Sequence, residues 1–582
     1  MRSVLIRKFL GPLCLLCVSA GVASALDREA FTITKYDLNI RLEPEQQRLG
    51  ARGKITLRND SANPQKIVAL QITSSLNWRS IRAGDKPLQF VSQPYVSDID
   101  HTGGLSEALV TLPAEIKPKD SVELEIGYEG VIPLDATRLT RVGVPDAIAR
   151  HTSWDQISPA FTAVRGAGYV AWYPITTVSA DFSEGNSLFE VVARWKARAA
   201  GSEFKARIGM DREGDILPLA VCTAGSPSFN EAVGGLQRMS TGCAWEKLGT
   251  VTPTFVMARY DNWYQSPFTL LSLAGHERGA GKYSAAFDPA AKFVGDWFGK
   301  PSVPIAIADH ADPNAAPFES GTLLLVSMAG EDTKFAGINL VHELVHSAFP
   351  SPRPWVYEGL AHFAEALYRE QQGGRQAALD LLGIHRSAFV DLEKEVTSAP
   401  ENVAPQPLAN TFEETFFRSK AAYVWWMLRD MVGDAALKQA LRNYRPADDT
   451  DPKYVERLVE AASGRDLAWF FDDWVYHDRG LPDLRVLAAH PWKPDGEQPG
   501  KQTKMITVTI ENRGLTSAEV PFTVRCLESD VTRRLEVRAK STATLRVELV
   551  SAPIDVVVND GSVPESDLKD NVFKIEAEGK QN

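Results

Sequence analysis

The spacing of hydrophobic residues changes twice along the 582 residues of this chain, and this change is the strongest constraint on its fold. From about residue 36 to 265, apolar and polar residues alternate, as in the stretch LFEVVARWKA, which predicts strands with one buried face. From about residue 281 the apolar residues recur at helical spacing, and after about residue 503 the alternation returns. A chain of this length exceeds the size of one hydrophobic core. The pattern therefore predicts a multidomain α+β protein.

The expected domain boundaries follow from these changes of period. We expect a β-rich N-terminal domain over residues 26–265, a mostly helical domain over 266–489 and a C-terminal β-sandwich over 490–582. The stretch HPWKPDGEQPGKQ, at positions 490–502, is interpreted as a linker that opens the last domain. Near the start of the helical domain, the stretch VPIAIAD is expected to form a short buried strand.

The first 25 residues have the composition of a secretory signal peptide. Arg2, Arg7 and Lys8 give a basic start, an apolar run follows, and Ala-Ser-Ala at positions 23–25 forms a small-residue cleavage site. An uncleaved anchor is the alternative, but the apolar run is shorter than the roughly 20 residues of a comfortable membrane span. We therefore expect an exported protein, periplasmic or extracellular after cleavage, with no transmembrane segment in the mature chain.

The charge balance excludes nucleic acid as a partner. Asp and Glu together number 74 against 63 Lys and Arg, the net charge is −11, and the two signs are interspersed. Nucleic-acid binding needs a basic patch or stripe, which this pattern does not provide. The sequence gives no indication of an oligomeric state.

Three of the five cysteines follow the signal peptide: Cys222, Cys243 and Cys526. Their wide spacing does not indicate a metal site. In an oxidising compartment Cys222 and Cys243 could close a short loop, and whether they form a disulfide is left open by the sequence.

The segment GINLVHELVHSAF contains His342, Glu343 and His346 in the arrangement H-E-x-x-H. Residues four apart lie on one face of a helix, so both imidazoles can reach one metal ion, while Glu343 stands beside them and can hold a water. In a random chain of this length with 10 His, the motif is expected only about 0.01 times. Two satisfied core histidines are the alternative. The motif predicts a Zn²⁺ site with Glu343 as its catalytic residue.

A catalytic zinc ion also needs a third protein ligand and an open position. The next helical segment, WVYEGLAHFAEAL, offers Glu358, His362 and Glu365 at positions i, i+4 and i+7, on one helix face. The residue types alone leave all three as candidates.

These segments resemble the gluzincin metallopeptidases, most closely the aminopeptidase N and leukotriene hydrolase family. The resemblance implies a thermolysin-like, mostly helical catalytic domain over 266–489 and places Glu358 in the ligand position. Only eleven residues lie between His346 and Glu358, and the usual family spacing would select Glu365 instead. Because the loop FPSPRP can shorten the connection, we assign His342, His346 and Glu358 as the metal ligands. Glu365 then resembles a carboxylate that orients a ligand imidazole.

A weaker part of the resemblance lies ahead of the zinc motif, in the stretch NAAPFESG. It implies that Glu319 is the substrate-binding glutamate, which binds the free α-amine of a peptide. Ala316, Phe318 and Ser320 depart from the family pattern around it.

A second weaker part lies downstream, in FFRSKAAYVWW. Lys420 matches the family pattern, but Arg418 stands where the family has the Tyr that stabilises the developing oxyanion. Either another donor such as Arg418 or Tyr423 takes this role, or the transition state is stabilised less strongly in this protein. The alternative interpretation of Tyr423 is a buried helix aromatic.

The function implied by the resemblance is that of a zinc-dependent metallopeptidase acting on peptide or protein substrates. An aminopeptidase that removes N-terminal residues is expected. A zinc endopeptidase and a catalytically impaired, peptidase-like binding protein are the alternatives.

Overall fold

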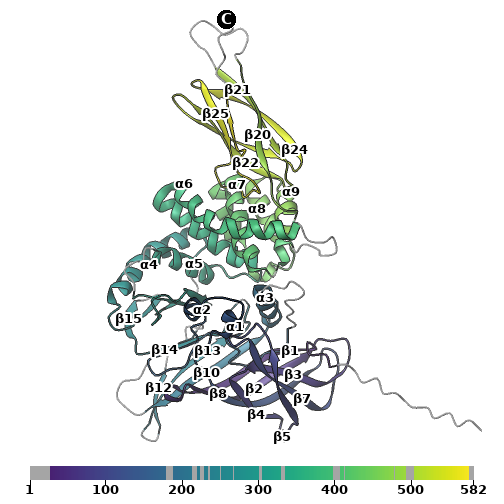
Figure 1. Ribbon diagram of the computed structural model, residues 1–582, viewed down its shortest axis with the longest axis vertical. Helices are drawn as coiled ribbons and strands as arrows, with labels where there is room; N and C mark the ends of the chain where they lie inside the picture. Colours follow the sequence, from purple (N-terminus) through teal and green to yellow (C-terminus); the bar gives the residue numbers. More distant parts are fainter. Residues whose placement is uncertain are drawn as a thin grey trace, which may run out of the picture.

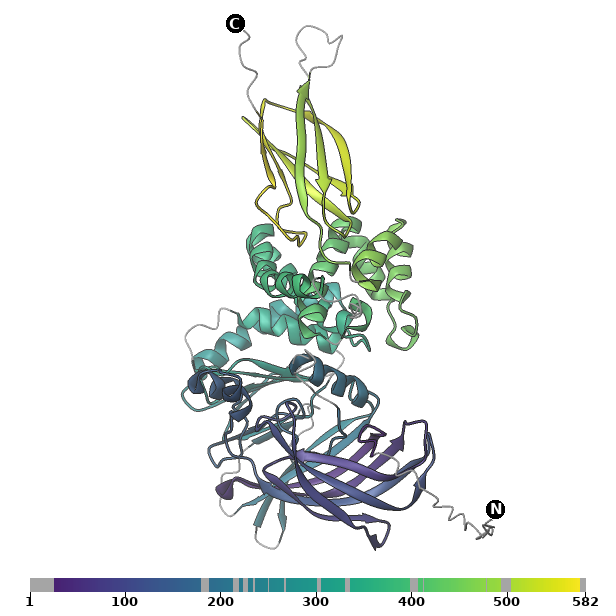
Figure 2. The same cartoon turned by 45° about the vertical axis from the view of Figure 1, so that its right-hand side comes forward.

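The computed structural model describes residues 26–178, 188–212, 219–222, 229–233, 236–249, 251–265, 268–300, 305–329, 335–397, 407–411, 413–477, 479–492 and 504–575. The predicted signal peptide lies outside these described residues. The molecule is elongated, with strands of the first third at one end, helices in the middle and a small set of strands at the other end (Figures 1 and 2). This arrangement confirms the predicted multidomain α+β organisation, with a β-rich N-terminal region, a mostly helical middle and a C-terminal β-sandwich.

The N-terminal region is built on an eight-stranded sheet. In spatial order the strands are β12 (Phe229–Val233), β13 (Leu236–Trp245), β10 (Glu203–Arg212), β1 (Phe31–Glu43), β2 (Arg48–Asn59), β8 (Ser121–Val131), β4 (Leu76–Ala83) and β5 (Lys86–Pro87). Alternate residues of β1 are buried, as expected for a sheet with one face on the core. The strand pairs antiparallel with β2 and parallel with β10, where Lys35 lies opposite Glu203.

Two three-stranded sheets and three helices complete this region. One sheet contains β3 (Gln65–Thr73), β7 (Gly104–Ile116) and β6 (Phe90–Val96), and the other contains β11 (Leu219–Cys222), β14 (Phe255–Ala258) and β9 (Phe161–Val164). The helices are α1 (Thr137–Arg141), α2 (Asp146–Thr152) and α3 (Leu188–Ala199). Cys222 of β11 is bonded to Cys243 of β13, and this disulfide joins two of the sheets. Cys526 is a buried free thiol.

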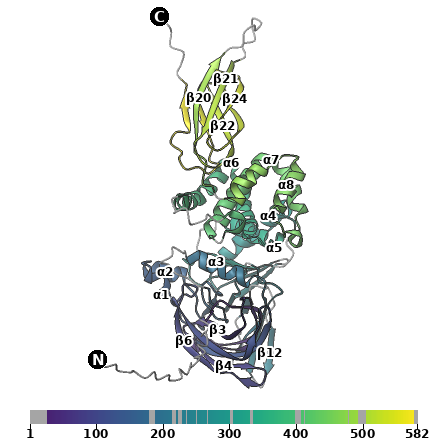
Figure 3. The ribbon, with the colours of Figure 1, turned by 90° about the vertical axis from the view of Figure 1, so that its right-hand side faces the viewer.

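The strand predicted for LFEVVARWKA is wrong, because this segment forms most of α3. Trp195 and Ala199 are buried in the N-terminal core, and Val192 packs against it. These three residues are spaced i, i+3 and i+7, which fits a helix face, and short apolar runs fit both periods. Figures 1 and 3 both place α3 between the N-terminal sheets and the helices of the middle region.

The middle region begins with a five-stranded mixed sheet. Its spatial order is β15 (Asp261–Gln265), β16 (Phe268–Ser272), β17 (Ile305–Asp309), β19 (Leu323–Val326) and β18 (Phe318–Ser320). Strand β17, the described part of VPIAIAD, is buried along its whole length and is paired parallel on both sides, which confirms the predicted buried strand. Strand β18 lies at the edge and runs antiparallel to β19.

Six α-helices follow among the described residues of this region. They are α4 (Glu277–Trp297), α5 (Ala336–Ala348), α6 (Pro354–Thr397), α7 (Ala421–Asn443), α8 (Tyr454–Ser463) and α9 (Ala468–Phe471). The connection from α5 to α6 takes only residues 349–353, and Pro354 opens α6 because its fixed φ suits the first helical position. Gly374 has a φ of 79°, which breaks α6 into two helices at that point.

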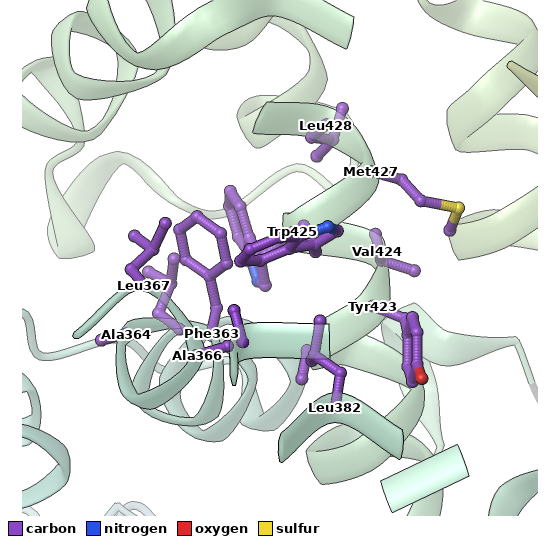
Figure 4. Close-up of a cluster of buried hydrophobic side chains, with 14 of the residues drawn as sticks. Phe363, Ala364, Ala366, Leu367, Leu382, Tyr423, Val424, Trp425, Met427 and Leu428 are labelled. Atoms are coloured by element: carbon purple, nitrogen blue, oxygen red, sulfur yellow. The ribbon is translucent and has the colours of Figure 1, made fainter. Parts of the chain in front are cut away.

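The helices α6 and α7 pack through large aromatic side chains. Figure 4 shows Trp425 of α7 in one buried cluster with Phe363 and Leu367 of α6. The Trp425 indole stacks on Trp355 at a centroid distance of 5.3 Å, and its Nε1 donates to the Trp355 carbonyl at 3.3 Å. This contact fixes the first turns of α6 against α7.

The C-terminal sandwich consists of two facing sheets. One contains β20 (Leu484–Trp492), β21 (Lys504–Asn512) and β24 (Ser541–Leu549), and the other contains β23 (Val531–Val537), β22 (Ala518–Cys526), β25 (Pro553–Val558) and β26 (Val572–Lys574). The start of the predicted linker, His490 to Trp492, belongs to β20 and pairs with β21, so these residues continue a strand. Its remaining residues lie outside the described ones. In the described part of the chain, no helix combines the length and apolar character that crossing a membrane requires.

Candidate metal centre

Helix α5 carries His342, Glu343 and His346 in the interior of the protein. The two histidines are 5% and 7% exposed, and Glu343 is fully buried. The Nε2 atoms of His342 and His346 lie 3.0 Å apart. Two imidazoles bound to one tetrahedral zinc ion would have their nitrogens about 3.3 Å apart, given zinc–nitrogen bonds of about 2.05 Å. The helix therefore presents both side chains at a separation that suits a single ion.

Two carboxylates complete a group of four potential ligands. Glu358 of α6 has Oε2 at 3.9 Å from the Nε2 of His342 and 4.0 Å from that of His346. Glu319 of β18 approaches from the other side, with Oε1 at 2.6 Å and 3.6 Å from the same two nitrogens. One ligand atom from each of the four residues lies within 4.8 Å of the other three.

The chemistry of this donor set fits a zinc ion. Two imidazole nitrogens and carboxylate oxygens are ligands that zinc prefers. Buried carboxylate oxygens at the site, both of Glu343 and Oε2 of Glu358, have no hydrogen-bond partner among the described residues. Buried polar atoms are normally paired, so orphan acceptors grouped in this way indicate a site for a cation.

Glu343 lies beside this group, but its carboxylate forms no hydrogen bond with the described residues. Both of its carboxylate oxygens are buried. Burial raises the pKa of Glu343 well above its ordinary value, and the charge of Glu319 raises it further. A carboxyl group in this environment can take up and return a proton.

Glu365 contacts the opposite side of His342. Its Oε1 lies 2.7 Å from the Nδ1 of His342, and its Oε2 lies 3.1 Å from the Nδ1 of His362. Burial opposes ionisation, but the two histidines outweigh it and hold the pKa of Glu365 below its ordinary value. Glu365 therefore fixes the His342 imidazole through its Nδ1, on the side of the ring opposite to the Nε2 that the other carboxylates approach.

Arg418 is the cation nearest to Glu358. It belongs to a π-helical turn, Phe416–Lys420, and its Nε lies 3.3 Å from Glu358 Oε2. Although burial opposes it, Arg418 together with His346 holds the pKa of Glu358 below its ordinary value. Tyr423 is fully buried in the helical core and is not among the described residues that line the neighbouring cavity. Of the two candidate oxyanion donors, only Arg418 reaches the cavity.

A cavity of about 410 Å³ opens onto these residues. The helical side contributes the metal-centre residues, and the N-terminal region contributes Arg138, Tyr169 and Lys196. Sequence reasoning missed these three residues, because they lie in segments without a motif and reach the site only through the tertiary fold. All predicted site residues, by contrast, lie in one cavity.

Comparisons with known proteins add two solved structures. No protein-family model and no curated protein matches the sequence. An M1 zinc metallopeptidase from Deinococcus radiodurans has a TM-score of 0.46 and 15% identity, over 77% of this chain and 94% of its own. A mutant M1 zinc metallopeptidase from the same organism, bound to a Tyr-Ser-Ala substrate, has a TM-score of 0.47 and 16% identity, over 78% and 96%. Similarity of this degree concerns the path of the chain and identifies no residue of the site.

Proposed function

We propose that this protein is a zinc-dependent metallopeptidase of the gluzincin type that removes N-terminal residues from peptides. The observation that carries the proposal is the meeting of His342, His346 and Glu358 beside the orphan carboxyl group of Glu343, at a cavity. A purely structural metal site has no need of an adjacent general base. The same cavity contains Glu319, which supports an exopeptidase.

His342, His346 and Glu358 would hold the zinc ion. A bound zinc ion would supply Lewis acidity, polarising the scissile carbonyl and making water a stronger acid. Glu365 fixes the orientation of the His342 ring through its Nδ1 and thereby directs the Nε2 lone pair toward the centre.

Glu343 acts on protons. Its carboxylate takes a proton from the attacking water and hands it to the leaving amine. Its two carboxylate oxygens are free of hydrogen bonds to the described residues, so they can hold the water and then reach the amine.

Glu319 selects the end of the substrate. It comes from a strand rather than from the two ligand helices, and its side chain is 22% exposed, more than that of Glu358 at 12%. A carboxylate in this position can pair with the ammonium group of a free peptide N-terminus. With Glu319 turned to the substrate, His342, His346 and Glu358 would remain as three protein ligands and would leave one position open.

The mechanism is tested with Glu343→Gln, which preserves the shape of the side chain and leaves all proposed ligands in place. Zinc should remain near one ion per chain, while turnover should fall by about 10² to 10⁴, the usual contribution of a positioned acid–base group. Glu115→Gln is the matched control, since Glu115 is exposed and distant from the cavity. Elemental analysis and peptide-cleavage rates give the two readouts.

The substrate class is tested with peptides that have a free or an N-acetylated end. Acetylation removes the cation that pairs with Glu319 and leaves that carboxylate unpaired, so only free peptides should be shortened, one residue at a time. Equal cleavage of both sets would replace the aminopeptidase with an endopeptidase. Absence of cleavage by zinc-loaded protein would favour a peptidase-like binding protein instead.

We also propose that residues 1–25 are removed on export. N-terminal sequencing of the exported protein should then begin at Leu26, and full-length cytosolic protein would contradict this.

A further inference from the structure

Arg138 is a buried cation that faces the cavity without an anionic partner. It is 5% exposed and lines the same cavity as His342 and Glu319. Its Nη1 donates to the carbonyl oxygens of Asp98 and Gly168 at 3.0 and 2.8 Å. Its Nε is buried without a hydrogen-bond partner among the described residues. Burial lowers the pKa of Arg138 and outweighs Asp100 and Asp155, which favour its charge from a distance.

The acidic residues around Arg138 are all engaged elsewhere. Asp98 pairs with Arg141, and Asp100 accepts from the backbone of Ala171 at 2.8 Å while lying 3.1 Å from Nδ1 of His101. Asp155 forms an ion pair with Arg165 at 2.7 Å. A guanidinium group stays charged at all relevant pH values, and a buried charge without a counter-charge is costly. An anion that enters the cavity would therefore supply the adjacent counter-charge that the described residues do not give Arg138.

Lys196 adds a second cation to this side of the cavity. It lies on α3 one turn after Val192, and both residues line the cavity. Lys196 is half-buried, and no ion pair of it is found within the described part of the chain. Tyr169 lines the cavity as well.

The charges of the cavity are thus divided between two sides, apart from Arg418 of the middle region, which pairs with Glu358 and Glu414. The acidic side chains, with the metal centre, come from the middle region, whereas Arg138 and Lys196 come from helices of the N-terminal region. Figures 1 and 3 show α3 next to the helices of the middle region. At about 410 Å³ the cavity has the volume of a small-ligand site and admits only a few residues of a peptide.

We propose that Arg138 and Lys196 form a subsite for a carboxylate of the bound peptide. This inference rests on the proposed function, because it takes the ligand to be a peptide whose amine lies at Glu319. The carboxylate is either the side chain of an acidic N-terminal residue or the C-terminal carboxylate of a dipeptide. Both present the same anion, which a guanidinium and an ammonium group can bind together through charge-assisted hydrogen bonds.

Binding by the zinc-loaded Glu343→Gln protein tests the subsite, since this variant should hold peptides without turning them over. One pair of peptides compares Glu-Ala-Ala-Ala-amide with Gln-Ala-Ala-Ala-amide, and the other compares Ala-Ala with Ala-Ala-amide. In one pair, the Kd of the carboxylate form measured by calorimetry should be lower by about 10- to 100-fold. The pair that shows the difference identifies the source of the carboxylate.

Second-site variants in the same background assign the effect to the two cations. Lys196→Gln should reduce the carboxylate preference by about three- to tenfold, and Lys196→Glu should reverse it. Arg138→Gln should abolish the preference. Because Lys196 is only half-buried, its two variants keep the test valid should the substitution of the buried Arg138 fail to fold. Lys66→Gln, an exposed strand residue away from the cavity, should leave the preference unchanged.

The outcomes separate this inference from the proposed function. Equal affinities within both pairs would overturn the subsite, even if the parent enzyme cleaves neutral peptides. A carboxylate preference in a parent protein that cleaves no peptide would overturn the peptidase and retain the anion subsite. Binding of none of the four peptides would overturn both.

Discussion

Each carboxylate around the two motif histidines has its own position. Glu358 and Glu319 lie near the Nε2 atoms, whereas Glu365 lies against the Nδ1 of His342. An imidazole binds a metal with one nitrogen and donates from the other, so these positions imply different chemical tasks. Of the two carboxylates near Nε2, Glu358 lies on α6, the helix after the one that carries the histidines. Glu319 lies on the edge strand β18.

Replacement of the three glutamates by alanine should weaken zinc binding to different degrees. Glu358→Ala should lose zinc at chelator concentrations that the parent tolerates, because a ligand is removed. Glu365→Ala should keep zinc with about 10- to 100-fold weaker affinity, the usual effect of losing a partner that orients a ligand. Glu319→Ala should keep zinc at the parental level.

Zinc content after stepwise chelation, measured by elemental analysis, checks this ranking. Loss of zinc from Glu319→Ala would make Glu319 a ligand and the centre a closed four-ligand site. Greater loss of zinc from Glu365→Ala than from Glu358→Ala would identify Glu365 as the third ligand, as the usual family spacing suggests.

How far the sequence predicts the site depends on how local each contact is. His342 and His346 are visible because both lie on one turn of one helix, and Glu358 because only five residues separate the following helix from the first one. Arg138 and Lys196 lie more than a hundred residues away in the sequence from that motif. Their place at the cavity depends on how the N-terminal region packs on the helices, which no periodicity encodes.

At the scale of elements, the position of Glu358 depends on the contact between α6 and α7. The next residue, Gly359, lies directly against α7: a Cβ at this position would lie 2.6 Å from the Cβ of Ala421 and 3.1 Å from Cδ1 of Trp425. The glycine thus allows the two helices to approach closely, with Trp355 stacked on Trp425 one turn earlier.

Gly359→Ala should therefore destabilise the helical region by about 1–3 kcal/mol through overpacking, despite the higher helix propensity of alanine. A lower melting temperature and easier loss of zinc are expected, since Glu358 is adjacent. Gly383→Ala is the matched control in the same element, because nothing lies within 4 Å of a Cβ there. It should leave stability unchanged or raise it by up to about 1 kcal/mol. Equal melting temperatures for the two variants would contradict the close contact.

At the scale of the whole molecule, His310 lies where the N-terminal region meets the mixed sheet. It follows β17, and its ring packs on Trp154 and Phe161 at centroid distances of 4.6 and 4.8 Å. Its Nδ1 accepts a hydrogen bond from the backbone N–H of Asp312 at 3.0 Å. Burial lowers the pKa of His310 to about 4, against the opposing effect of the Asp312 carboxylate.

The stability of this contact should depend on pH in a defined direction. His310 is neutral when folded, and its pKa of about 4 lies below the 6.5 of a free histidine. The unfolded chain therefore binds the proton first, and the contribution of His310 is complete above pH 6.5 and is lost as the pH falls toward 4. The loss amounts to about 2–3 kcal/mol in the free energy of unfolding.

Denaturant unfolding at pH 7 and pH 4.5 measures this effect. His310→Asn keeps an acceptor for the Asp312 N–H and removes the titration, so it should lose about 2–3 kcal/mol less than the parent on acidification. His490→Asn, at an exposed position, is the control and should follow the parent. The same acid dependence in His310→Asn and the parent would remove His310 as the cause.

The overall architecture is predictable from the sequence because hydrophobic period reports local structure over long stretches. The helix α3 escaped prediction because its apolar residues fit a strand as well as a helix, and packing against the N-terminal core decides between them. The order of strands in the eight-stranded sheet is a property of distant segments and has no local signal.

The parallel pairing of β1 with β10 also constrains how the chain can be made. Strand β1 lies between β2, which follows at once, and β10, which begins only at Glu203. While the chain is being synthesised or threaded through a membrane pore, one edge of β1 has no partner until some 170 further residues have emerged. An unpaired strand edge is prone to aggregation, and pairings over such distances form slowly. We therefore expect the nascent protein to depend on chaperones over this interval.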